Sequence, residues 1–168
     1  LDENKQPNSL LAVSEEMGNK AHERCVAFHS LSKRSNLPGL RSGFVAGDKK
    51  LLDQYFLYRT YHGCAMSGLT QEMSAIAWGD EGHVLENREL YKEKFSLVES
   101  ILGDSYPIYR PDGGFYHWIK TPVEDQEFSA SLMEKFNVKV MPGSFLSREQ
   151  NGDNPGANHV RVAWVSSV

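Results

Sequence analysis

The sequence predicts a protein of the α/β or α+β class. Short apolar runs typical of strands alternate with stretches in which apolar residues recur at helical spacing, and this alternation occurs in both halves of the chain. Hydrophobic residues make up 40% and charged residues 24% of the 168 residues. This composition is ordinary for a soluble globular protein, and the length suits about one domain.

In the first half of the chain, a short helix is expected over residues 9–24, followed by strands over 25–30 and 43–47. Asp48 is a suitable N-cap for the next helix, because its side chain can accept a hydrogen bond from a backbone N–H of the first turn. One side of that helix would carry Leu51, Leu52, Tyr55 and Tyr58. Another helical stretch ends near Trp78.

The second half begins with the longest predicted helix, residues 83–102, in which apolar and charged side chains lie on opposite faces. Strands are expected over 115–119, 138–141 and 160–165. The short helix between the first two of these strands carries on one stripe Phe128, Leu132 and Phe136. The aromatic side chains of the first strand that are expected in the core are Phe115, Tyr116 and Trp118.

The sequence pattern changes near Gly103, where prolines and glycines become frequent. We therefore expect a first part over residues 1–80, a connecting helix over 81–102 and a second part over 103–168. The chain starts without methionine and stops in an apolar, strand-like run. From both ends, we expect the sequence to be a piece of a longer polypeptide.

Charge and cysteine content exclude several classes of partner. The net charge is −4, and no run of Lys or Arg is longer than a pair, which argues against binding to nucleic acid or to an anionic membrane. No apolar run approaches the roughly 20 residues of a membrane span, and no signal peptide is evident. Cys25 and Cys64 are too few for a disulfide framework, and a cytoplasmic location is expected. The histidines lack metal-ligand spacing, so no metal is predicted.

The segment SLSKRSNLPGLRSG, residues 30–43, combines groups that suit a phosphorylated ligand. It follows a predicted strand, and ligands of α/β proteins bind beyond the carboxyl ends of strands. Ser30 and Ser32 offer hydroxyl donors, and Arg41 offers a planar guanidinium that matches phosphate. The Pro38–Gly39 pair permits a sharp turn that brings the arginine back toward the first serine.

Lys33 stands between these donors. A primary amine forms a Schiff base with an aldehyde when it is neutral, a state that nearby cations and partial desolvation favour. Together with its neighbours, Lys33 would hold a phosphorylated aldehyde. The alternative is a polar loop with a solvent-exposed lysine.

The whole segment resembles the cofactor-lysine signature of the class I and II aminotransferases. In that pattern Ser-x-Ser-Lys is followed by glycine six residues and arginine eight residues after the lysine, and Gly39 and Arg41 occupy those places. Ser42 departs from the pattern, since an aliphatic residue is usual there. The resemblance implies an α/β protein of the pyridoxal-phosphate-dependent transferase fold type I. The chain would hold the end of the large domain and most of the small one.

The resemblance also implies roles for individual residues. Lys33 would bind pyridoxal 5'-phosphate covalently and act as the catalytic group, Ser30 and Arg41 would bind the cofactor phosphate, and Ser32 would lie beside it. Arg161, within the apolar run VRVAWV, resembles the arginine that grips the substrate α-carboxylate. Without the resemblance, Arg161 is equally well explained by strand alternation at a wet edge.

Several stretches, among them SKRSN and the run PGSFL to VR, are similar to bacterial N-succinyldiaminopimelate aminotransferases of lysine biosynthesis. This implies transamination between L-glutamate and N-succinyl-2-amino-6-oxopimelate in a homodimer. Alternatives are another class I or II aminotransferase, a C–S lyase, or a C-terminal fragment without catalytic activity. The family's cofactor-ring aspartate and tyrosine are expected upstream of the opening LDEN. The chain alone is therefore expected to be inactive or nearly so.

Overall fold

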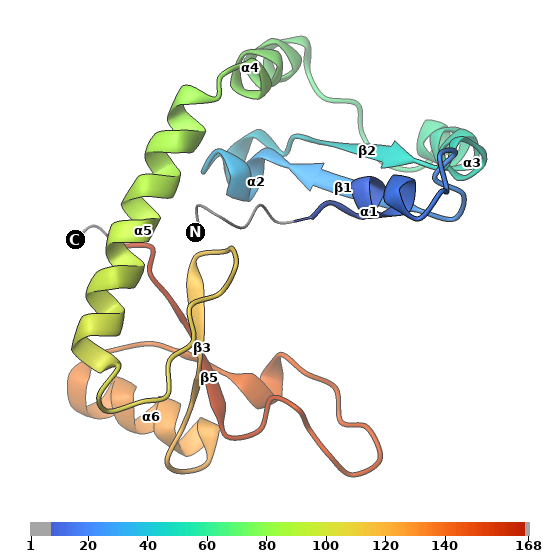
Figure 1. Ribbon diagram of the computed structural model, residues 1–168. Helices are drawn as coiled ribbons and strands as arrows, with labels where there is room; N and C mark the ends of the chain where they lie inside the picture. Colours follow the sequence, from blue (N-terminus) through green and yellow to red (C-terminus); the bar gives the residue numbers. More distant parts are fainter. Residues whose placement is uncertain (1–7, 167–168) are drawn as a thin grey trace. The chain divides into compact units, whose positions relative to one another are not determined.

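The computed structural model describes residues 8–166 and divides them into two compact units, residues 8–87 and 88–166. The opening LDEN, which is expected to follow the aspartate and tyrosine strand, lies outside the described residues. The division falls within helix α5 (Gly82–Leu102), the helix expected to connect the two parts (Figure 1). The finer boundaries at residues 80 and 102 stay predictions.

The first unit is organised around a two-stranded antiparallel sheet (Figure 1). Strand β1 (Val26–Ser30) pairs with β2 (Gly43–Gly47) along its whole length, so that the last residue of β1 faces the first residue of β2. The predicted strands over 25–30 and 43–47 are thus confirmed to within one residue. The pairing fixes both ends of the segment 31–42 next to each other.

Helix α1 (Leu10–Glu16) is shorter than the helix expected over residues 9–24, and that prediction was wrong for its second half. The helix begins where Ser9 Oγ accepts a hydrogen bond from the backbone N–H of Ala12 at 3.0 Å. It ends at Glu16 because Gly18 follows with a positive φ angle of 86° and its N–H donates to Glu15 O at 2.9 Å, the usual glycine termination of a helix. His22 and Arg24 further on also have positive φ angles, 51° and 61°, which a right-handed helix does not allow.

Asp48 caps helix α3 (Lys49–Tyr61), as the sequence predicts, since its Oδ1 accepts a hydrogen bond from Lys50 N at 2.8 Å. Its Oδ2 accepts a second one from Arg24 N at 2.7 Å. The bond from Arg24, followed by the bond from Lys50, lowers the pKa of the Asp48 carboxyl despite its burial. One carboxylate therefore joins the start of α3 to the residues before β1.

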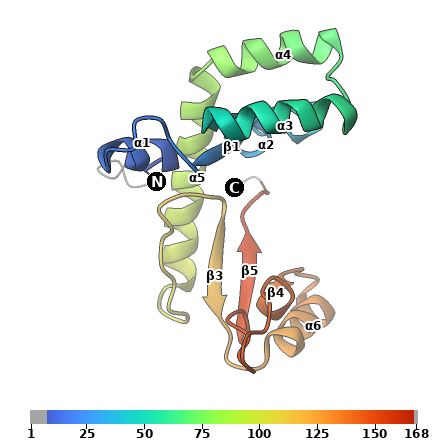
Figure 2. The same cartoon turned by 90° about the vertical axis from the view of Figure 1, so that its right-hand side faces the viewer.

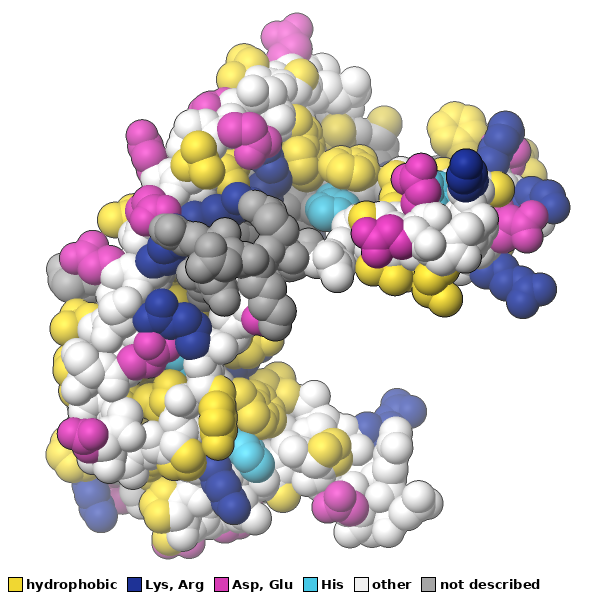
Figure 3. Space-filling view, viewed as in Figure 1, with side chains coloured by type: hydrophobic (Ala, Val, Ile, Leu, Met, Phe, Trp, Pro, Cys, Tyr) yellow, Lys and Arg dark blue, Asp and Glu magenta, His cyan; other side chains and the backbone are white. Residues whose placement is uncertain are grey.

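Large apolar side chains remain on the surface of the first unit. Phe28 on β1 is 70% exposed and Phe56 on α3 is 77% exposed. The apolar side of α3 predicted from Leu51 and Tyr58 is likewise exposed rather than buried. Hydrophobic side chains are visible at the surface in Figure 3. Such exposure is typical of a surface that packs against more protein.

The second unit contains a three-stranded antiparallel sheet in the order β3-β5-β4. Its strands are β3 (Tyr116–Lys120), β4 (Met141–Pro142) and β5 (His159–Ala163). Helix α6 (Asp125–Phe136) lies beside β4 and β5 (Figure 2). Helix α4 (Gly68–Gly79) belongs to the first unit. The core of the second unit consists of Ile119, Val140 and Val160, with Leu102, Tyr106, Ile108, Phe128, Leu132 and Val162 packed against it.

Three sequence predictions for the second unit were wrong in part. The strand expected over 138–141 is reduced to Met141–Pro142. Phe136 is 69% exposed instead of packed with the other members of its stripe. On β3 the strand alternation buries His117 between two exposed aromatic residues, Tyr116 and Trp118, which were expected in the core.

A buried carboxylate ties α6 to the loop that precedes β5. Asp125 is 1% exposed, and its Oδ2 accepts hydrogen bonds from the backbone N–H and the hydroxyl of Ser144 at 2.9 and 2.7 Å. Its Oδ1 accepts one from Asn158 N at 3.2 Å. Burial acts to raise the pKa of Asp125, but the bonds from Ser144 and then Asn158 outweigh it, so the pKa lies below its ordinary value.

Replacing this carboxylate should therefore destabilise the second unit. Asp125→Ala removes three accepted hydrogen bonds and leaves buried donors unsatisfied, so the free energy of unfolding should fall by about 2–3 kcal/mol. Urea denaturation followed by circular dichroism measures this change. Glu134→Ala on the exposed side of the same helix is the matched control, with an expected change within about 0.5 kcal/mol. Equal effects of the two substitutions would contradict the role given to Asp125.

Candidate functional site

Ser30 stands at the junction of β1 and a one-turn helix, α2 (Leu31–Arg34), in the segment that the sequence suggested was a loop. Its Oγ accepts a hydrogen bond from Ser32 N at 3.1 Å and so caps the helix. The same hydroxyl lies 3.0 Å from Ser32 Oγ and 3.3 Å from the carbonyl oxygen of Ser42. The structure thus brings two of the predicted cofactor residues, Ser30 and Ser32, into direct contact.

Lys33 lies in the same turn, exposed to solvent. Leu31, two residues earlier, is fully buried. Residues two apart in a helix point in nearly opposite directions, so burial of the leucine turns the lysine outward. The position of Lys33 therefore follows from one apolar anchor and one serine cap.

Arg41 follows a single 3-10 turn, η1 (Pro38–Leu40), and adopts a left-handed conformation with φ 49° and ψ 36°. Its Nη1 donates a hydrogen bond to the carbonyl oxygen of Pro38 at 3.0 Å. The backbone N–H of Leu31 donates to the carbonyl oxygen of Ser42 at 3.1 Å. This bond closes the loop, and Arg41 directly precedes Ser42, the residue whose carbonyl oxygen accepts it.

Arg34 is a further important residue of this turn, and the sequence reasoning missed it. Its Nη1 donates to the carbonyl oxygen of Ala77 at 3.0 Å, and its Nη2 pairs with Glu81. Its guanidinium also lies 5.0 Å from the centre of the Trp78 ring. These contacts bind α2 to the end of α4. The arginine's place directly after the signature lysine was the only sequence signal, and its partners lie more than 40 residues away.

Arg161, the predicted carboxylate-binding residue, belongs to the second unit. It lies on β5, opposite Trp118 in the strand register. Its guanidinium carbon is 5.6 Å from the centre of the Tyr116 ring, a geometry that suits a cation–π contact. The neighbouring pair Trp118 and His159 stack at 5.8 Å between ring centres. Arg161 is thus surrounded by aromatic side chains on the outer face of the sheet.

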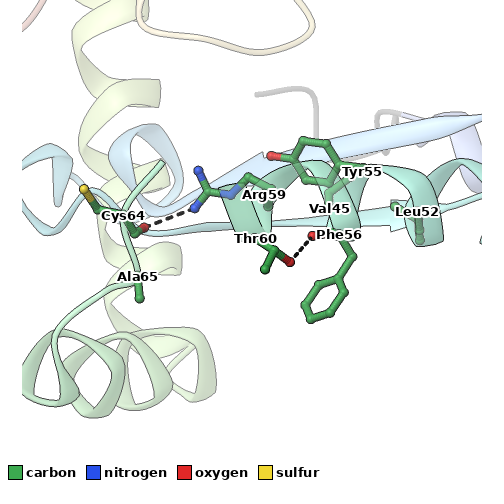
Figure 4. A pocket seen from close by; sticks show the side chains of 8 residues that line it. All are labelled: Val45, Leu52, Tyr55, Phe56, Arg59, Thr60, Cys64 and Ala65. Atoms are coloured by element: carbon green, nitrogen blue, oxygen red, sulfur yellow. Dashed lines mark hydrogen bonds between the residues drawn. The ribbon is translucent and has the colours of Figure 1, made fainter. Parts of the chain in front are cut away.

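A hollow of about 480 Å³ lies elsewhere in the first unit (Figure 4). Its walls are mostly apolar, and they are formed by Val45, Leu52, Tyr55, Phe56, Arg59, Thr60, Cys64 and Ala65. The Arg59 guanidinium donates a hydrogen bond to the carbonyl oxygen of Cys64 at 3.2 Å. None of the predicted cofactor residues lines this hollow. It is therefore separate from the lysine turn, that is, the segment 30–42, which carries Lys33 and Arg41.

Neither a metal-binding cluster nor a membrane-spanning helix is found within residues 8–166. No group of three or more His, Cys, Asp or Glu side chains could hold a metal ion there. None of the helices in this part of the chain has the length and apolar character of a membrane span.

Comparison with known proteins decides the family. The family model "Aminotransferase class I and II" matches residues 4–164. The chain belongs to the class I and II aminotransferases. It is 32% identical over 147 residues to a probable aminotransferase, Rv1178, of Mycobacterium tuberculosis, and this match covers 87% of the chain and 34% of that protein. It is 33% identical over 158 residues to the LL-diaminopimelate aminotransferase of Natranaerobius thermophilus, covering 88% of the chain and 38% of that protein.

The chain is also similar to a solved aminotransferase structure from Neisseria meningitidis. The two share 47% identity with a TM-score of 0.93, over 99% of this chain and 42% of the other. The prediction of an α/β fold of the aminotransferase type is thereby confirmed. This aminotransferase chain spans about two-fifths of the length of the relatives it matches.

The contacts of Arg34 generate a prediction about the lysine turn of this aminotransferase chain. Arg34→Ala removes the bonds to the end of α4, so α2 should open more often and the Ser35 amide, which donates to Leu31 O at 3.0 Å, should exchange faster. An increase of roughly tenfold corresponds to about 1.4 kcal/mol. Hydrogen exchange measured by NMR tests it, with Lys20→Ala in an exposed turn as the control. Unchanged exchange at Ser35 would show that Arg34 does not hold the turn.

Proposed function

We propose that this chain supplies the cofactor lysine, the phosphate-binding groups and the carboxylate-binding arginine of a pyridoxal-phosphate-dependent aminotransferase. One observation carries the proposal. The turn capped by Ser30 holds Lys33 exposed, while the loop that begins there returns Arg41 to the same end of the sheet. The family match supports transamination as the type of reaction.

The donor set of the lysine turn fits pyridoxal phosphate. The Ser30 hydroxyl and the Arg41 guanidinium are donors of the kind that bind a phosphate dianion. The Lys33 amine is the group that binds an aldehyde carbon covalently. Ser32, in contact with the Ser30 hydroxyl, would orient that hydroxyl. When bound, the cofactor supplies a ring that withdraws electrons from the amino acid Cα.

Lys33 has a second task in this proposal. When its amine is not bound to the cofactor, Lys33 would take the proton from the substrate Cα and return it to another atom, as a general base and then a general acid. An exposed lysine on a capped turn suits this task, because its long side chain can move between two positions while its backbone stays fixed. The Leu31 anchor and the Arg34 contacts keep that backbone in place.

Arg161 would bind the α-carboxylate of each substrate. A guanidinium pairs with a carboxylate through two parallel hydrogen bonds, which fixes orientation as well as position. Tyr116 packs beside the guanidinium and limits the directions in which it can point. The rigid strand pairing of β5 with β3 supports this arrangement.

For the substrates, L-glutamate as amino donor and N-succinyl-2-amino-6-oxopimelate as acceptor remain the prediction. Relatives named LL-diaminopimelate aminotransferase support a diaminopimelate-related acceptor. The proposed assembly is a cytoplasmic homodimer. Two alternatives, another aminotransferase specificity and a C–S lyase, differ in the reaction but not in the lysine that would hold the cofactor. The third alternative is a fragment that performs no catalysis.

Covalent trapping tests the proposal without requiring turnover. The chain is incubated with a low concentration of pyridoxal phosphate, reduced with borohydride, digested, and analysed by mass spectrometry. The modified lysine should be Lys33, because it lies in the segment that carries the proposed phosphate donors, Ser30 and Arg41. Arg41→Ala should lower the labelling of Lys33 by roughly tenfold, since the phosphate loses a charge-assisted contact.

Exposed lysines provide the comparison within the same digest. Lys49 on α3 and Lys139 should be labelled weakly and independently of Arg41. If all lysines are labelled alike, or if Arg41→Ala changes nothing, the turn does not select the cofactor and the proposal is wrong.

The carboxylate role of Arg161 gives a separate prediction. Arg161→Lys keeps the positive charge but cannot form two parallel hydrogen bonds to a carboxylate. The affinity of the chain for glutarate should therefore fall by roughly 10- to 100-fold. Calorimetric titration at low ionic strength measures it. The matched control is Arg148→Lys, an exposed arginine of the same unit, which should leave the affinity unchanged. Equal affinities of all three proteins would rule out Arg161 as the carboxylate site.

A further inference from the structure

A histidine is buried inside the second unit, on the opposite face of β3 from the aromatic residues beside Arg161. His117 is 1% exposed. Its ring meets the ring of Phe95 on α5 edge to face, with 4.6 Å between centres. Its Nδ1 lies 2.8 Å from the indole Nε1 of Trp164, the residue directly after β5. This side chain on β3 is therefore packed against α5 and against the residue that follows β5.

The contact with Trp164 fixes the protonation of His117. An indole N–H is only ever a donor, so Nδ1 must be the acceptor and must carry no proton. The neutral imidazole then carries its proton on Nε2. That atom is buried and has no hydrogen-bond partner within residues 8–166. The Glu99 carboxylate on α5 lies 3.6 Å from it.

Glu99 is not available to His117 as an independent base. Its carboxylate accepts three hydrogen bonds from the Arg110 guanidinium, at 2.6, 2.8 and 3.1 Å. The bond from Arg110 holds the pKa of Glu99 below its ordinary value. A further charged group near this junction is Lys94 on α5, whose Nζ donates to the carbonyl oxygen of Trp164 at 3.2 Å. One anion and two cations thus lie around the imidazole.

Trp164 extends the β3–β5 ladder beyond its last residue, since its backbone N–H donates to Phe115 O at 3.0 Å. Its side chain bonds to His117 and its carbonyl bonds to Lys94. These contacts join the end of β5 to β3 and α5. Arg161 lies on the same strand three residues earlier.

We propose that His117 is a positioning residue that holds the end of β5, and with it Arg161, only while its imidazole is neutral. The inference rests on the proposed carboxylate role of Arg161. A proton on Nδ1 removes the acceptor for the Trp164 indole and places a second N–H against it. The new cation is buried between Phe95 and Trp164. The end of β5 then loses one of its fixed contacts, and the guanidinium loses its orientation.

The environment of His117 favours the neutral state. Burial lowers the pKa of His117, Glu99 opposes this, and Arg110 adds to the lowering. Because the pKa is lower in the folded chain than in the unfolded one, protons bind preferentially to the unfolded state. The stabilisation is complete above the ordinary histidine pKa of about 6.5 and is lost as the pH falls through the window below it.

Nuclear magnetic resonance on the ¹⁵N-labelled chain tests the proposal. At about pH 7.5 the His117 ring should show the Nε2–H tautomer, and the Trp164 indole proton should be protected from exchange. On acidification to about pH 5 the protection should fall by roughly tenfold, together with the affinity for glutarate.

Two substitutions of His117 separate positioning from mere packing. His117→Asn keeps an oxygen acceptor near the place of Nδ1 but does not titrate, so protection of Trp164 should become independent of pH. Its glutarate affinity should fall less on acidification than that of the unmodified chain, the remaining fall being due to protonation of glutarate itself. His117→Leu lacks the acceptor and should show low protection at both pH values. His62→Asn, at an exposed position, should behave as the unmodified chain does.

The Nδ1–H tautomer at neutral pH would overturn the proposal, as would unchanged Trp164 protection while His117 titrates. A change in Trp164 without a change in glutarate affinity would also overturn it, provided that Arg161→Lys weakens glutarate binding. If Arg161→Lys has no effect, the proposed carboxylate role fails, and the positioning claim that rests on it fails with it. The tautomer and the acid titration of the unmodified chain decide the matter even if a variant does not fold.

Discussion

The lysine turn depends on one backbone carbonyl, that of Ser42. It accepts a hydrogen bond from Leu31 N at 3.1 Å and lies 3.3 Å from the Ser30 hydroxyl. These bonds bring the two ends of a long loop together directly above the β1–β2 pair. They hold the backbone at the two ends of the loop from which the side chains of Lys33 and Arg41 extend. Burial of Leu31 and the contacts of Arg34 then set the direction of the turn.

The second unit uses buried polar groups in the same way. Asp125 accepts bonds from Ser144 and Asn158 and so holds a long loop against α6. His117 joins the end of β5 to β3 and α5. Each of these groups is costly to bury alone and stabilising when its partners are in place. The apolar core packs the elements together, and the polar groups select one arrangement of the loops between them.

Local patterns in the sequence predicted most of the fold. Strands β1 and β2 and the Asp48 cap were recognisable because period-two alternation and capping act over a few residues. The helix expected over residues 9–24 was too long, because an apolar pattern does not show that Gly18 adopts the positive φ angle that ends α1. The spacing of Ser30, Lys33 and Arg41 predicted the turn proposed to bind the cofactor, whereas the contacts of Arg34 and His117 depend on partners distant in sequence. Tyr116 and Trp118 were placed in the core because hydrophobicity does not reveal which face of a strand is covered.

The contact at Ser42 has a consequence for how the signature varies. Only its main-chain oxygen takes part in closing the loop, and every amino acid supplies that atom. The side chain is buried, at 5% exposure, so the space around it restricts its size. A serine can therefore replace the usual aliphatic residue without altering the turn. A search pattern that insists on side-chain identity at this place would discard chains whose loop closes in the same way.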